Sequence, residues 1–268
     1  MKFDKEYFNI GRLDLLSYQD TPVHRLDPRA KVITTLIFIL AVVSFPKYEI
    51  AALIPFFLFP VLLISFGDLP VGFLIKKILI VSPFAVLTGM FNPLFDENSI
   101  SFFTLTFSAG WISFASILLK YTLTISAALV LIATTSFPGM CHALRKLGLP
   151  SLFVSQLLFL YRYLFVLMEE TMKIVRAHDM RSFGKQRMQS HTAARIIGSL
   201  FLRTVERAER IYSAMLSRGF QGDVLSLRQE RIHSTDILFA ISTIIVIGLF
   251  RWHSLPVMLG TLIQGAML

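Results

Sequence analysis

The stretch YTLTISAALVLIATTSF, Tyr121–Phe137, contains no charged residue and is the cleanest apolar run in the chain. With the apolar residues before it, from about 112, it is long enough to cross a bilayer, which takes about 20 residues as a helix. Hydrophobic residues make up 54% of the 268 and charged residues 16%, whereas soluble domains are about a quarter charged. A period of two residues is absent, which argues against a transmembrane β-barrel. These patterns predict an all-α, polytopic helical membrane protein.

About five apolar stretches are expected to span the membrane, four of them before a long, more polar region and one after it. Residues 1–31 are polar and lack the apolar core of a signal peptide, so the first span is expected to act as its own insertion signal. Lys31 and Lys47 flank this span and can extend to the interfaces. The predicted spans are residues 32–46, 50–66, 71–91, 112–136 and 236–250.

Charge placement divides and orients the chain. Residues 162–231 hold 13 of the 26 lysines and arginines against seven acids, and basic loops stay cytoplasmic. The sequence therefore predicts a cytoplasmic segment 1–31, four spans within 32–136, cytoplasmic or interfacial helices in 137–234, and a closing span with an apolar tail in 235–268. Whether the end of that tail, residues 254–268, also spans the membrane is left open.

The more polar region is expected to form three helices. A short interfacial helix ends at Gly148, and a long one begins after Pro150. Arg162 near the middle of the long helix would cost about 2.5–3.5 kcal/mol inside a bilayer. This helix is therefore expected to lie against the inner face of the membrane or other helices, with a true span as the alternative. The third helix, about 190–217, is amphipathic, with one stripe formed by Ile197, Phe201, Val205, Ala208, Tyr212 and Met215.

The sequence lacks the motifs of several functional classes. It contains no G-x-x-x-x-G-K-[ST], no H-E-x-x-H and no G-x-S-x-G. The six histidines are scattered, and the one cysteine, Cys141, cannot form an internal disulfide. Neither a metal site nor a cofactor is therefore expected. His178 and Asp179 come nearest to a functional pair, but two solvated neighbours explain them better.

Two helix ends in the polar region share an arginine followed by a glycine. The stretch SAMLSRGF, Ser213–Phe220, ends the third helix, and AHDMRSFG, Ala177–Gly184, ends the second. Glycine after a helix accepts the left-handed conformation, and an arginine in the last turn suits the negative end of the helix dipole. One such end is explained as a well-stopped helix, whereas two in the same region indicate a docking surface.

The order of spans, polar region and helix ends resembles the transmembrane T component of energy-coupling factor (ECF) ABC transporters, most closely the cobalt transport protein CbiQ. The stretch HRLDPRAK, His24–Lys31, is also similar to the segment that leads into the first span of that family. In the family, two Ala-Arg-Gly-like signatures end the coupling helices that dock into two ABC-type ATPase subunits. The resemblance covers nearly the whole chain.

The resemblance assigns the two signatures to residues of this chain. In the second, a serine replaces the alanine, and in the first, Phe183 interrupts the motif. The implied ATPase-coupling residues are Arg181, Ser182, Gly184, Ser217, Arg218 and Gly219. Three stripe residues are expected to belong to the packing of the polar region, with contact to a partner membrane subunit as the alternative: Phe201, Val205 and Tyr212.

The resemblance implies a non-enzymatic coupling subunit in the plasma (inner) membrane of a prokaryote. Its implied partners are two ABC-type ATPase subunits, a substrate-binding membrane S component and membrane lipids, with no nucleic acid. ATP and Mg²⁺ would be used by the ATPases, and this chain would bind no cofactor. Cobalt is the first expected cargo and nickel the next.

Other functional classes remain as alternatives. One is a T component that serves vitamin uptake. Another is a self-sufficient secondary transporter, which would depend on an intramembrane charge such as Lys120. A lipid-modifying membrane enzyme is disfavoured, because the polar side chains around Arg162, Glu169 and His178 have no catalytic spacing.

Overall fold

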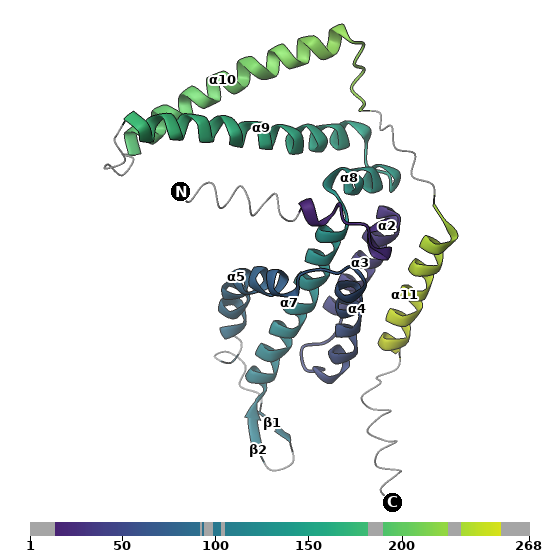
Figure 1. Cartoon of the computed structure of the whole chain (residues 1–268). Helices are drawn as coiled ribbons and strands as arrows, with labels where there is room; N and C mark the ends of the chain where they lie inside the picture. The colour runs from purple at the N-terminus through teal and green to yellow at the C-terminus, as the bar shows by residue number, and fades with distance from the viewer. Residues whose placement is uncertain are drawn as a thin grey trace, which may run out of the picture. The chain divides into compact units, whose positions relative to one another are not determined.

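The computed structural model describes residues 14–91, 93, 99–102, 105–181, 190–224 and 232–252 (Figure 1). Apart from one pair of short strands, the regular elements in these residues are helices, which confirms the predicted all-α class. The chain divides into two compact units. The bundle unit combines Leu13–Ser136 with Glu230–Leu268, and the hairpin unit includes Phe137–Gln229.

The bundle unit is built on α7, which contains Tyr121–Thr134 of the apolar run that predicted the fold. α7 packs against α3 and α5, and α3 also packs against α11. α5 and α7 come close together at Gly89, where an added Cβ would lie 2.8 Å from the ring of Phe114. The helices of this unit are α2 (Pro22–Arg25), α3 (Pro28–Val43), η1 (Ala51–Phe57), α4 (Leu58–Phe66), α5 (Val71–Met90), α7 (Ala109–Thr134) and α11 (Ser234–Trp252). Between α5 and α7, β1 (Ser99–Phe102) pairs antiparallel with β2 (Leu105–Ser108), Ser99 opposite Ser108.

The predicted spans differ in how closely the helices match them. α5, α7 and α11 lie where spans were predicted and are long and apolar enough to cross a membrane. The first span, predicted at 32–46, is the 16-residue α3. The second, predicted at 50–66, is divided into the 3₁₀-helix η1 and α4. Pro55 lies inside η1, and its missing N–H and rigid ring disfavour a continuous α-helix there.

α9 (Ser151–Arg181), in the hairpin unit, is a fourth helix with the length and composition of a span. Because of Arg162, its predicted position is against the inner face of the membrane or against other helices. In the first half of α9, from Ser151 to Met168, Arg162 is the one charged residue, which explains why this helix is apolar enough to be a candidate.

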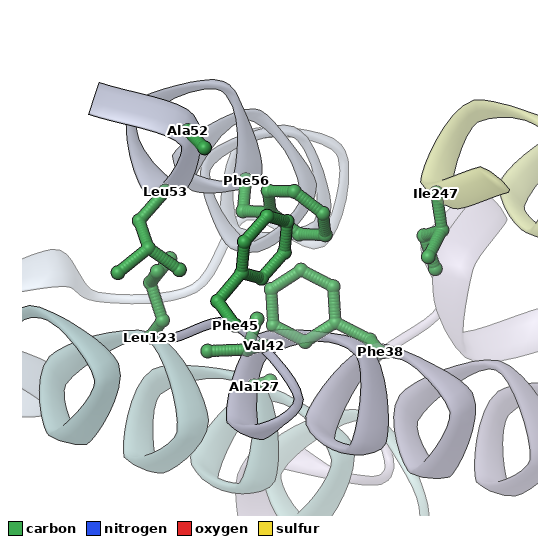
Figure 2. Packing of buried hydrophobic residues seen from close by; sticks show 9 residues of the cluster. All are labelled: Phe38, Val42, Phe45, Ala52, Leu53, Phe56, Leu123, Ala127 and Ile247. Atoms are coloured by element: carbon green, nitrogen blue, oxygen red, sulfur yellow. The ribbon is translucent and has the colours of Figure 1, made fainter. Parts of the chain in front are cut away.

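The core of the bundle unit is a cluster of buried side chains from several helices (Figure 2). Phe56 stands at its centre, with ring centroids 5.9 Å from Phe38 and 5.2 Å from Phe45. Tilted and edge-on ring pairs of this kind are favourable beyond their buried area. The cluster comprises Phe38, Val42, Phe45, Ala52, Leu53, Phe56, Leu123, Ala127 and Ile247.

One buried carboxylate joins the starts of two helices of the bundle unit. Asp236 is 3% exposed. Its Oδ2 accepts the backbone N–H of His233 at 2.8 Å, which caps α11, and its Oδ1 accepts the backbone N–H of Asp27 at 3.0 Å. Asp27 in turn caps α3 by accepting the N–H of Arg29 at 2.8 Å. The positive ends of two helix dipoles therefore meet at Asp236.

Lys31 holds the C-terminal end of α7. It is 5% exposed and points inward rather than toward the interface. Its Nζ donates to the carbonyl oxygens of Thr134 at 2.8 Å and His24 at 3.2 Å. The Thr134 oxygen is among the last carbonyls of α7, which have no partner within the helix, so the lysine charge satisfies an acceptor at the negative end of the dipole.

His24 lies beside this contact and is held in one tautomer. Its Nε2 donates to the carbonyl oxygens of Leu16 at 3.0 Å and Ala133 at 3.3 Å. Because those oxygens can only accept, Nδ1 accepts the hydrogen bond from the hydroxyl of Thr21 at 2.7 Å. Burial lowers the pKa of His24 below its ordinary 6.5; the two carbonyl contacts oppose this shift, and the charge of Lys31 adds to it.

We expect the bundle unit to lose stability as the pH falls below 6.5. The pKa of His24 is lower in the folded than in the unfolded chain. The contribution of neutral His24 to stability is therefore fully present above the unfolded pKa and is lost as the pH falls through the folded pKa. Thermal unfolding in detergent should therefore have a lower midpoint at pH 5 than at pH 7.5. The variant His24→Gln should reduce this difference, and an unchanged pH dependence in His24→Gln would show that other groups cause it.

The hairpin unit contains the three helices expected in the polar region. They are α8 (Phe137–Lys146), α9 and α10 (Ser190–Ser217). α8 ends at Gly148, whose φ of 110° suits glycine, and the N–H of Leu149 returns to the carbonyl of Leu144 at 3.1 Å. This is the glycine stop that the sequence predicted. α9 follows after Pro150.

Candidate functional site

The second arginine–glycine end forms a complete glycine C-cap. Gly219 has a φ of 79°, and the N–H of Phe220 donates to the carbonyl of Met215 at 3.0 Å. This arrangement turns the chain sharply after α10. Arg218 is exposed directly before the turn, and Ser217 is also exposed, its hydroxyl bonded back to the carbonyl of Ser213 at 3.0 Å.

The residues after this turn anchor it to α8 and the start of α9. The ring of Phe220 lies 5.9 Å from that of Phe159. Asp223 accepts a hydrogen bond from Nη2 of Arg145 at 2.5 Å, and the N–H of Val224 donates to the hydroxyl of Ser155 at 3.3 Å. These contacts therefore hold the turn that follows Arg218 against α8 and α9. Sequence reasoning did not find these anchors, because their partners lie more than 60 residues away.

Of the three coupling residues predicted at the first arginine–glycine end, the structure describes Arg181 alone. It is the last residue of α9 and is exposed. Ser182 and Gly184 lie outside the described residues, as do residues 1–13 and the tail 254–268.

α9 and α10 form an antiparallel hairpin that separates the two arginines. Glu170 Oε1 lies 3.5 Å from Arg203 Nη1 near the middle of the hairpin, while Phe159 meets Phe220 close to the start of α9. Arg218 therefore lies near the beginning of α9 and Arg181 at its far end. Arg181 follows Phe159 by about six helical turns, so the two ends are roughly 33 Å apart along α9.

The stripe residues of α10 lie on its surface. Phe201, Val205 and Tyr212 are 64%, 40% and 54% exposed in the chain by itself, and both expectations for them, internal packing and contact with a partner membrane subunit, stay predictions. A groove of about 660 Å³ runs between α9 and α10. Val205 and Tyr212 line it and Phe201 does not. The structure therefore brings two of the three residues together at one groove.

Other candidate residues from the sequence make contacts within their own unit. Lys120 donates a hydrogen bond from Nζ to the carbonyl of Phe45, after the end of α3. His178 Nδ1 lies 3.5 Å from Asp179 Oδ1. Within the described part of the chain, no group of three or more histidines, cysteines or carboxylates could hold a metal ion.

The fold and its apolar helices define a multi-pass membrane protein. The family model described as "Cobalt transport protein" (CbiQ) matches residues 19–230. The chain thus belongs to this family and is a T component of energy-coupling factor transporters, which confirms the resemblance found in the sequence.

Individual relatives extend over most of the chain. The energy-coupling factor transporter transmembrane protein EcfT of Bacillus subtilis is 28% identical over 216 residues, covering 75% of this chain and 81% of its own. EcfT of Streptococcus thermophilus is 26% identical over 256 residues, covering 87% and 94%. An uncharacterized protein of Methanocaldococcus jannaschii is 26% identical over 239 residues, covering 85% and 81%.

Proposed function

We propose that this T component couples two ABC-type ATPase subunits to a substrate-binding membrane S component in an ATP-driven uptake transporter. The observation that carries the proposal is the pair of exposed arginines, Arg181 and Arg218, at opposite ends of the α9–α10 hairpin. Their separation of roughly 33 Å along the hairpin suits two separate partner subunits, one at each end.

The chemistry of the two ends suits docking into an acidic groove. A guanidinium group forms charge-assisted, often bidentate hydrogen bonds with carboxylates. At the second end, Gly219 turns the chain away directly after Arg218, so the arginine stands at the tip of the helix. In this proposal Ser217, Arg218 and Gly219 form one docking end, and Arg181, with Ser182 and Gly184, forms the other.

The exposed stripe on α10 is the proposed contact for the S component. Phe201, Val205 and Tyr212 present apolar and aromatic surface on an amphipathic helix. Such a surface favours a partner that is itself apolar, as a membrane subunit is.

The proposed cargo is cobalt, with nickel next, and it rests on the name of the family. The relatives named as EcfT carry no cargo in their names, so vitamin uptake is the alternative. The relatives named as EcfT are transporter transmembrane proteins, in line with a non-catalytic role. In this proposal the partner ATPases use ATP and Mg²⁺, and the S component holds the metal cargo.

The proposed orientation places the N-terminus and the coupling region, residues 137–234, in the cytoplasm of a prokaryote. The excess of basic residues in 162–231 supports it. Residues 32–136 and 235–268 then form the membrane part in the plasma membrane.

Co-purification with candidate ATPases tests the proposal. We expect the native chain, co-expressed with ATP-binding subunits from the same genome, to retain two ATPase subunits per chain. The double variant Arg181→Glu with Arg218→Glu should reduce this retention at least about tenfold, because removing one partner of an interfacial charge pair typically costs about 2–5 kcal/mol.

The matched control is Arg207→Glu, which reverses an exposed arginine near the middle of the hairpin, about 16 Å along α10 from Arg218, and should retain the ATPases. Retention that survives the double reversal would place docking elsewhere on the chain. If the native chain captured no ATPase at all, a secondary transporter would be the better explanation, and Lys120 would be the first residue to replace.

A further inference from the structure

An open apolar groove of about 400 Å³ runs between α11 and the η1–α4 segment in the bundle unit. Figure 2 shows Ile247 of α11 on one side, facing Phe38 and Phe56 on the other. Every side chain that lines the groove is uncharged, and the hydroxyl groups among them belong to Ser242 and Thr243. Ser242 donates its hydroxyl to the carbonyl of Phe239 in its own helix at 2.9 Å. The groove therefore offers an apolar ligand no charged obstacle.

The size of the groove matches one lipid chain better than a protein helix. Along α11 its lining extends from Phe239 to Phe250, roughly 16 Å at the rise of an α-helix. One leaflet of the hydrocarbon core is about 15 Å thick, half of the total. A volume of about 400 Å³ lies within the range of small-ligand sites, about 300–1,000 Å³, whereas a helix with its side chains is about 10–12 Å wide.

A guanidinium group lies at one end of this groove. Arg251 directly follows Phe250, and its Cζ lies 4.4 Å from the ring centroid of Phe45. Phe45 packs edge-on against Phe56, and Phe56 packs against Phe250, with centroids 5.2 and 5.9 Å apart. The last two rings line the groove, so the cation is connected to its wall by direct ring contacts.

The contacts of Arg251 leave donors for a ligand. Within the described part of the chain, Arg251 donates hydrogen bonds through Nη2 alone, to the carbonyl oxygen of Ser44 at 3.4 Å and to its hydroxyl oxygen at 3.3 Å. A guanidinium carries five N–H donors, and this one is exposed. The contacts to Ser44 fix its position, and the remaining donors can bind an anion.

Two lysines lie near the same turn. Lys120 donates to the carbonyl of Phe45, and Lys47 lies 5.0 Å from the ring centroid of Tyr48. In the orientation proposed above this end of the bundle unit faces outward, where the positive-inside rule disfavours basic residues. Three cations around one turn on that side favour an anionic ligand at the headgroup level.

From this arrangement we infer that the bundle unit binds one anionic phospholipid, with an acyl chain in the groove between α11 and the η1–α4 segment and the phosphate at Arg251. The site goes beyond the coupling function and concerns a different unit of the chain. The apolar lining accounts for the chain of the lipid, and the fixed guanidinium accounts for its charge.

Native mass spectrometry of the purified full chain tests this site. The detergent-solubilised protein is titrated with palmitoyl-oleoyl phosphatidylglycerol and, separately, with palmitoyl-oleoyl phosphatidylcholine. We expect one tightly retained phosphatidylglycerol per chain and weaker retention of phosphatidylcholine. Arg251→Gln should weaken phosphatidylglycerol binding about fivefold, since one basic residue near an anionic lipid contributes about that factor, and should leave phosphatidylcholine binding unchanged.

Two variants of α11 test the groove itself. Ser242→Phe fills the groove from one wall and should abolish retention of the lipid. Ile241→Phe adds the same ring at the next residue, which is 51% exposed and does not line the groove, and should retain it. Thermal unfolding of each variant shows whether it is folded.

Three results would overturn the inference. One is retention of phosphatidylglycerol by folded Ser242→Phe at the native level. Another is equal binding of the two lipids with no effect of Arg251→Gln, which would mean chain binding without headgroup recognition. The third is occupation of the groove by a co-purifying membrane subunit that Ser242→Phe displaces while the bound lipid stays. Loss of ATPase docking in the experiment above would not affect any of these readouts.

Discussion

Replacing Asp236 by alanine is expected to lower the free energy of unfolding of the bundle unit by about 3 kcal/mol, within the range for leaving buried hydrogen-bonding groups unsatisfied. The carboxylate accepts the backbone N–H groups of both Asp27 and His233, and burial keeps water from replacing it. Both groups lie at helix starts, so the favourable interaction with two helix dipoles is lost as well. Thermal or denaturant unfolding in detergent would measure the change.

Asp236→Asn provides the matched comparison. Its single carbonyl oxygen can replace one of the two acceptor oxygens and its amide group cannot replace the other, so we expect an intermediate loss of stability. Glu49→Ala, which removes an exposed acid, should leave the unfolding midpoint unchanged. An Asp236→Ala variant as stable as the native chain would show that the contact between the starts of α3 and α11 contributes little.

Reversing the charge of Asp223 is expected to release the second docking end. In Asp223→Arg, two guanidinium groups would stand where Arg145 now meets the carboxylate at 2.5 Å, and close like charges cost several kcal/mol. We expect amide hydrogen exchange in residues 218–224 to become at least about tenfold faster, equivalent to about 1.4 kcal/mol. If the docking proposal is right, capture of the ATPase at this end should fall as well.

The charge-swapped variant, Arg145→Asp with Asp223→Arg, should restore both protection and capture, because it re-forms the pair in the opposite order. Glu206→Arg is the control: it removes the partner of Arg210 from an exposed pair at 3.9 Å, and such surface pairs contribute about 0–1 kcal/mol. If Asp223→Arg left exchange unchanged, Phe220 and Val224 alone would be holding the turn.

The features predicted correctly from the sequence are those with local causes. The apolar run at Tyr121–Phe137 gives the second half of α7 regardless of its neighbours, because a bilayer-spanning segment must satisfy its own backbone. Gly148 and Gly219 stop α8 and α10 through their own backbone conformation. The division of the second predicted span into η1 and α4 also has a local cause, because Pro55 disfavours a continuous α-helix. Hydropathy measures only how apolar the segment is, so it does not reveal this division.

The features that sequence reasoning missed depend on distant partners. Lys31 has the pattern of a residue that reaches the interface, and the carbonyl of Thr134, 103 residues away, directs it inward instead. Asp223 looks like an ordinary loop acid until Arg145 is placed beside it, 78 residues earlier in the chain. The role of Phe201 depends on a neighbour as well, because an amphipathic stripe shows that a helix has an apolar face and not which molecule covers it.

The contact between Asp27 and Asp236 also sets an order of events during synthesis. The two residues are 209 positions apart, and the residues from Phe137 to Gln229 between them belong to the other unit. At about 5–20 residues per second, the ribosome makes Asp236 roughly 10–40 s after Asp27. For that interval the N–H of Asp27 lacks its final acceptor, and the bundle unit lacks α11. A chain truncated before Ser234 would remain permanently in that unfinished state, which makes the bundle unit one of those folds that can close only after another unit of the same chain has been synthesised.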